Sequence, residues 1–166
     1  MNVKTATMIF FVFLLIAALF FRTHSVKNGN EFRPLTEEEI KKLVEGRKLD
    51  VIAVKDIGNQ TVVLYRTSGG GGYLILSVSS GRLVESEATW TSSGNVSVST
   101  HRTGTPFIAL ILNNSGFREV IVKCGNFSKT YNVTEVGLII PVDLNARLCE
   151  LSPLQRDGRI LVYRLS

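Results

Sequence analysis

The chain has 166 residues, 45% of them hydrophobic and 20% charged, which leaves room for one ordinary domain and excludes a disordered tail or a multi-span membrane protein. Its formal net charge is +5. Because the arginines are scattered one to a strand or turn, we expect no nucleic-acid partner, and only a weak attraction to an anionic membrane or envelope polymer.

The first predicted element is an apolar run over residues 8–21, preceded by the single charge of Lys4. A signal-peptide core needs roughly 7–15 apolar residues and a full membrane span roughly 20, so the run is of intermediate length. Thr23 and Ser25 provide a small-x-small cleavage site. We therefore expect residues 1–25 to be a signal peptide or a membrane anchor. The rest of the chain would lie outside the cytoplasm, secreted or held at the membrane by this one segment.

A polar linker and a short amphipathic helix are predicted for residues 26–49. Thr36 and Glu39 have the spacing of a capping box, and Leu35 can pack on Ile40 across the helix start. Gly46 is the expected stop signal at the other end. A helix of about three turns does not fold alone, so we expect it to lie against the following domain.

From residue 50 to 166 the apolar pattern has a period of two, which predicts a mostly β domain. The expected strands cover residues 51–55, 61–66, 73–78, 82–91, 96–103, 107–112, 119–124, 129–133, 138–142, 147–151 and 159–165. Short strands with a turn signal every 8–12 residues indicate an antiparallel β-sandwich or a small barrel. The segment 107–112 is apolar on both faces, so we expect a central strand, covered by the partner sheet and by the helix.

No motif predicts a catalytic residue, a metal ligand or a cofactor. His101 is the one histidine outside the N-terminal segment, and we interpret it as a solvent-exposed strand residue. Glu85 and Glu87 share one strand face, where a solvated pair is favoured over a glycosidase site. The glycine run 69–72 lacks the following Lys and helix of a phosphate loop, and we expect a flexible hairpin loop.

Two further groups of residues bear on the compartment and on modification. Cys124 and Cys149 are the only cysteines, and outside the cytoplasm they can form a disulfide or remain as two core thiols. Possible glycosylation sequons, N-x-S/T, begin at Asn59, Asn95, Asn113, Asn126 and Asn132. Five aromatic side chains could form a sugar-stacking platform, although core packing is favoured: Tyr65, Tyr73, Trp90, Tyr131 and Tyr163.

The segments 60–66, 105–109 and 156–163 resemble small uncharacterised extracytoplasmic proteins of Gram-positive bacteria. That group combines an N-terminal signal or anchor with one β-sandwich-like domain. The resemblance implies the same organisation for this chain, and it brings no known active residues with it.

Together these features favour a non-catalytic binding or interaction module of the cell envelope or medium, with an envelope protein or polymer as partner. Two alternatives stay open. One is an extracellular hydrolase that uses a dispersed acidic site, and the other is a subunit of a surface assembly.

Overall fold

The computed structural model describes residues 31–92, 94–113, 116–142 and 149–165. The chain from Phe32 onward forms one compact unit, which contains the helix as well as the strands. The predicted signal or anchor, residues 1–25, and the start of the linker lie outside the described residues. Within the described part of the chain, no helix is long and apolar enough to cross a membrane.

Helix α2 (Glu37–Arg47) begins as predicted, with Thr36 as its N-cap. The Thr36 hydroxyl accepts from the Glu39 amide, and the Glu39 carboxylate accepts from the Thr36 amide at 2.8 Å, which completes the capping box. The predicted stop at Gly46 is wrong. The left-handed residue is Lys48, at φ 55°, because the chain turns back there to pack Leu49 against the sheet.

The strands are all antiparallel and follow the order of the predicted series, although β10 runs four residues past the predicted end of 147–151 and β11 covers only the end of the predicted 159–165. They are β1 (Asp50–Ile57), β2 (Gln60–Thr67), β3 (Gly70–Ser79), β4 (Arg82–Thr91), β5 (Val96–His101), β6 (Phe107–Leu112), β7 (Phe117–Cys124), β8 (Phe127–Asn132), β9 (Gly137–Pro141), β10 (Cys149–Gln155) and β11 (Tyr163–Leu165). The mostly β, antiparallel fold is confirmed, and its packing is consistent with a β-sandwich.

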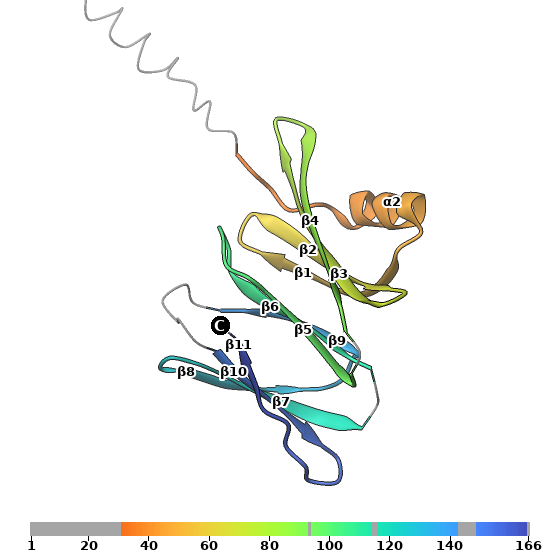
Figure 1. The fold of residues 1–166 in the computed structure, drawn as a ribbon. Helices are drawn as coiled ribbons and strands as arrows, with labels where there is room; N and C mark the ends of the chain where they lie inside the picture. The colour runs from red at the N-terminus through yellow and green to blue at the C-terminus, as the bar shows by residue number, and fades with distance from the viewer. Residues whose placement is uncertain (1–30, 93, 114–115, 143–148, 166) are drawn as a thin grey trace, which may run out of the picture. The chain divides into compact units, whose positions relative to one another are not determined.

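These strands form three sheets rather than two. The first sheet has the order β1-β2-β3-β4, the second β5-β6-β9, and the third β11-β10-β7-β8. The second sheet lies between the other two, and α2 covers the outer face of the first sheet (Figure 1). The chain is therefore layered as helix, first sheet, second sheet and third sheet.

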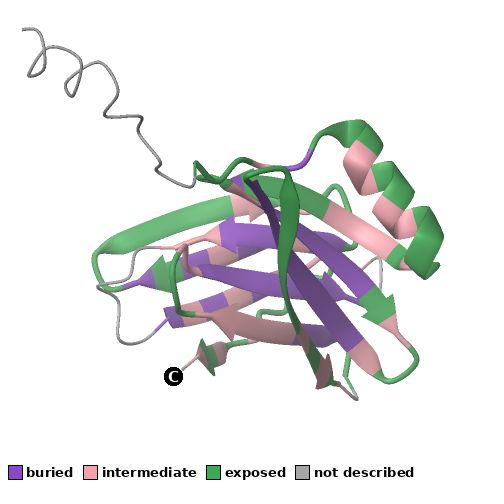
Figure 2. Ribbon diagram, turned by 90° about the horizontal axis from the view of Figure 1, so that it is seen from above, coloured by how far each residue is buried: buried purple, intermediate pink, exposed green. Residues whose placement is uncertain are grey.

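The central strand β6 explains this stacking, since every one of its residues is buried. Phe107, Ala109 and Ile111 face the first sheet, whereas Ile108, Leu110 and Leu112 face the third sheet. Both faces of β6 are thus covered by sheets. The expectation that the helix covers one face of this strand is wrong, because α2 packs on β2 and β3 instead. Figure 2 shows the inner strands, which include β3 and β6, as mostly buried and most of α2 as exposed.

The glycine run corrects a second expectation, because Gly70, Gly71 and Gly72 belong to β3 and only Ser68 and Gly69 form the turn. A Cβ on Gly72 would overlap the Tyr65 ring, and one on Gly71 would lie 2.6 Å from Cζ2 of Trp90. The run leaves room for aromatic rings that cross the sheet, so these glycines have a packing role.

Candidate functional site

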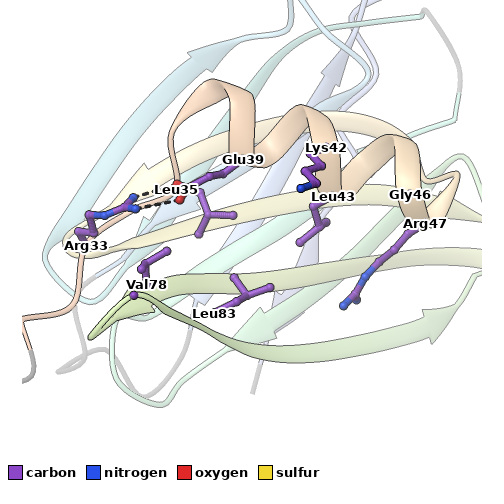
Figure 3. A pocket seen from close by; sticks show the side chains of 10 residues that line it. Arg33, Leu35, Glu39, Lys42, Leu43, Gly46, Arg47, Val78 and Leu83 are labelled. Carbon is purple, nitrogen blue, oxygen red and sulfur yellow. Dashed lines mark hydrogen bonds and ion pairs between the residues drawn. The ribbon is translucent and has the colours of Figure 1, made fainter.

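The candidate site is a groove between α2 and the β3–β4 hairpin, on the outer face of the first sheet (Figure 3). Its volume is about 460 Å³. Leu35 and Leu43 from the helix side face Val78 and Leu83 from the strands, so the floor of the groove is apolar. Leu83 keeps 46% of its surface exposed and extends the apolar floor of the groove toward solvent.

Charged side chains line the rim of this groove. Arg33 forms a two-pronged ion pair with Glu39, at 2.8 and 2.9 Å, and lies next to the N-cap (Figure 3). The Arg33 guanidinium, together with the Thr36 amide, lowers the pKa of Glu39 to about 2. Arg47 pairs with Glu85 of β4 at 2.5 Å and so joins the end of the helix to the edge strand. Lys42 has no hydrogen bond or ion pair to the described residues, and its ammonium group is available at the rim.

Beside the groove, the phenol of Tyr65 donates a hydrogen bond to the carboxylate of Glu87. Burial of the ring, and then the neighbouring carboxylate, raise the pKa of Tyr65 to about 12. Glu85 and Glu87 do share one strand face, as the sequence indicates, but each is bonded to a different partner. They are not poised as an acid and base pair, since one carboxylate is held by Arg47 and the other by a phenol.

Strand β4 forms the outer edge of the first sheet, and no described strand pairs with its far side. The Ser92 amide donates to the Gly69 carbonyl at 2.9 Å, in register with the Gly70–Thr91 pair. Hydrogen-bonded pairs alternate along an antiparallel ladder. The backbone N–H and C=O groups of Leu83, Glu85, Glu87, Thr89 and Thr91 therefore point to the open side. Their side chains lie on the groove face, as the Arg47 and Tyr65 bonds show.

A second groove, of about 560 Å³, lies on the other side of α2 against β1. Its apolar lining comes from Ile40 and Val44 of the helix and from Val51 and Val54 of the strand. It borders β1, the other edge strand of the first sheet, whose register is interrupted by a bulge between Val51 and Ala53. The helix thus lies on the sheet with open apolar surface on both sides, and none of its own residues is fully buried.

His101 is half buried at the end of β5, so the expectation of a solvent-exposed histidine is only partly right. Its ring stacks on Phe107, with 5.1 Å between the centroids, and Nδ1 lies 3.3 Å from the Tyr73 hydroxyl. Burial lowers the pKa of His101, against the opposing contact with Thr103. Its Nε2 lies 3.2 Å from the Thr103 hydroxyl, and no carboxylate of the described residues bonds the ring, so we interpret these surroundings as a packing environment.

The remaining aromatic residues do not form one stacking platform. Tyr73 and Trp90 are 6.0 Å apart in the core between the first two sheets, and Tyr65 lies on the outer face of the first sheet. Tyr131 and Tyr163 belong to the third sheet. Among the residues that the structure describes, no three His, Cys, Asp or Glu side chains are grouped as metal ligands would be.

Cys124 and Cys149 lie directly opposite each other on β7 and β10 and form a disulfide, with their Cα atoms 4.2 Å apart. All five sequon asparagines are exposed: Asn59, Asn95, Asn113, Asn126 and Asn132. Of these, Asn113 donates to the Gly94 carbonyl at 2.8 Å.

Sequence reasoning missed the groove and the free edge of β4. The adjacent apolar residues Leu83 and Val84, close after the turn at Ser80 and Gly81, were an available signal. Neighbouring residues of a strand face opposite sides, and 46% of the surface of each of these two is exposed, so the hairpin end is uncovered on both faces.

No family model matches the chain, and neither a curated protein nor a solved structure matches it.

Proposed function

We propose that this protein is a non-catalytic interaction module outside the cytoplasm, and that it binds an extended segment of a partner protein along β4. The observation that carries this proposal is the free β4 edge beside an apolar groove. An incoming strand gains affinity from backbone hydrogen bonds, and pockets for alternate side chains provide specificity.

The groove defines the chemistry of the partner segment. Leu35, Leu43, Val78 and Leu83 accept an apolar side chain, and Lys42 at the rim accepts a carboxylate. Because the neighbouring Arg33 and Arg47 are already paired with Glu39 and Glu85, Lys42 supplies the uncompensated charge. The preferred segment is an extended one that carries an apolar residue close to an acidic residue.

The extracytoplasmic location draws on two independent features. The apolar run 8–21 has the composition of a signal or anchor, and the Cys124–Cys149 disulfide is of a kind that persists in oxidising compartments. With an anchor retained, the partner would be an envelope protein, and with a cleaved signal it would be secreted or exposed on a surface.

The test is photocrosslinking in the native compartment, with a benzophenone amino acid in the full chain at Leu83. Val162, with 57% of its surface exposed and no place in the groove, is the matched control position. We expect one adduct at position 83, mapped by mass spectrometry to a segment with adjacent apolar and acidic residues, and its loss in Lys42→Glu.

Equal labelling at positions 83 and 162, or an adduct that survives Lys42→Glu, contradicts the groove as the binding surface. Reproducible turnover of a peptidoglycan, glycoside or ester substrate, abolished by one polar substitution, contradicts the non-catalytic assignment.

A further inference from the structure

Two of the five sequons differ from the others in having both of their polar side chains exposed and unengaged. In Asn126-Phe127-Ser128 and Asn132-Val133-Thr134 the asparagine and the hydroxyl residue are exposed. Within the part of the chain that the structure describes, none of these four side chains has a hydrogen bond. The fold itself therefore gives no reason for these residues.

In two other sequons the fold uses the hydroxyl. Thr61, of the Asn59 sequon, is fully buried, donates to Asp56 at 2.7 Å and accepts from the Leu35 amide at 2.9 Å. Ser97, of the Asn95 sequon, is 1% exposed and accepts from the indole N–H of Trp90 at 2.6 Å. These hydroxyl groups are explained by folding and are closed to an enzyme that acts on the folded surface.

The number of sequons is also higher than composition requires. Five of the ten asparagines begin a sequon. About one residue in six is Ser or Thr, so ten asparagines would produce roughly two sequons by chance. Two sequons explained by the fold account for that expectation, and three remain. In one of these the Asn113 side chain donates to the Gly94 carbonyl, which leaves the pair at Asn126 and Asn132.

We propose that Asn126 and Asn132 carry N-linked glycans. The co-reactant is a lipid-linked glycosyl diphosphate. The amide nitrogen of asparagine bonds to the anomeric carbon of the sugar, and the bond from that carbon to the diphosphate oxygen breaks. The lipid diphosphate leaves with the electron pair, and the amide proton passes to a base on the transferase. This inference does not rest on the proposed binding function.

The position of the two sites gives the glycans a physical role. Asn126 precedes β8 and Asn132 is its last residue, about 20 Å away at the rise of an extended strand. Among the described strands, β8 is an edge strand of the third sheet. The Val133 amide donates to the Arg118 carbonyl at 2.8 Å, so these two residues form a hydrogen-bonded pair of the β7–β8 ladder. Because such pairs alternate along an antiparallel ladder, the backbone N–H and C=O groups of Ser128, Thr130 and Asn132 point away from β7, to the open side. An open edge of this kind invites pairing with a second chain, and a bulky glycan at each end blocks it sterically.

The first test is peptide mapping of the full-length protein from its native source. Cleavage after Lys and Arg separates the sites, since residues 124–129 hold Asn126 and residues 130–147 hold Asn132. Residues 56–66 and 83–102 hold Asn59 and Asn95 as internal controls. We expect added sugar mass on the first two peptides and none on the controls. Unmodified peptides at Asn126 and Asn132, or equal modification of the controls, overturns the proposal.

The second test asks whether the glycans prevent self-association through the β8 edge, and it uses the same native host. The full-chain variant Asn126→Gln/Asn132→Gln should self-associate with rising concentration in sedimentation velocity, whereas Asn59→Gln/Asn95→Gln should sediment as the native protein does. Ser128→Ala/Thr134→Ala removes the same sequons and keeps both asparagines, so it should reproduce the self-association. Monomeric behaviour of both β8 variants overturns the edge role of the glycans.

Discussion

At the scale of single residues, the absence of a side chain at Gly72 is a tight packing constraint. A methyl group there would overlap the Tyr65 ring, which is 4% exposed. Gly72→Ala should therefore destabilise the protein by about 1–3 kcal/mol, the usual cost of overpacking a core. Denaturant unfolding measures the change. Gly69→Ala is the matched control, because a Cβ there meets nothing within 4 Å. A neutral Gly72→Ala would contradict the packing role of the run.

The pKa of Tyr65 predicts how stability depends on alkaline pH. The folded pKa is about 12, above the value near 10 in an unfolded chain. The neutral phenol therefore stabilises the fold fully below about pH 10, and this contribution is lost as the pH rises toward 12. The wild type should lose stability more steeply than Tyr65→Phe between pH 10 and 12, in denaturant titrations at fixed pH. Tyr163→Phe should follow the wild type. Parallel curves for wild type and Tyr65→Phe would contradict the raised pKa of Tyr65 in the folded protein.

Residue-scale features could be predicted from the sequence where the interaction is local. The capping box joins Thr36 and Glu39 three residues apart, and the alternation that places Glu85 and Glu87 on one face needs only the strand period. Their partners could not be predicted, because Arg47 and Tyr65 are 38 and 22 residues away in the chain.

At the scale of elements, the disulfide is a covalent link between β7 and β10. The cysteines are separated by 25 residues. Chain-entropy arithmetic gives about 3.5 kcal/mol of stabilisation for a closed loop of this length. We expect Cys124→Ala/Cys149→Ala to lose stability by this order in urea unfolding. Reductant should lower the stability of the wild type by a similar amount and leave the double variant unchanged. A double variant as stable as the oxidised protein would contradict this account.

Element boundaries were predicted where a turn signal stands at both ends of a strand. Strands β4 and β6 begin and end at the predicted residues, since Gly81, the Ser92–Asn95 segment and the Asn113 turn interrupt the period of two. The glycines at the start of β3 were misassigned to a loop. Glycine is a loop signal in local sequence, and only the rings of Tyr65 and Trp90, from other strands, show why it is needed in a sheet.

At the scale of the whole domain, the number of layers could not be predicted. The apolar faces of the segment 107–112 indicate that something covers each side, but they do not distinguish a helix from a sheet. In the structure, β6 contributes to both cores, one shared with the first sheet and one with the third. Its neighbour β9 does the same, with Ile140 in one core and Ile139 in the other, so the second sheet joins the two cores.

A strand that belongs to two cores should make the domain unfold as one unit. Leu151 is fully buried in the core between the second and third sheets, and Leu151→Ala should cost about 2–5 kcal/mol. Trp90, the only tryptophan, packs against the other core and reports on it by fluorescence. We expect Leu151→Ala to shift the denaturation midpoint of Trp90 fluorescence as far as that of far-UV circular dichroism. Val162→Ala, at an exposed position, should shift neither midpoint. If the layers were independent, the Trp90 midpoint would stay in place while the dichroism curve divided into two transitions.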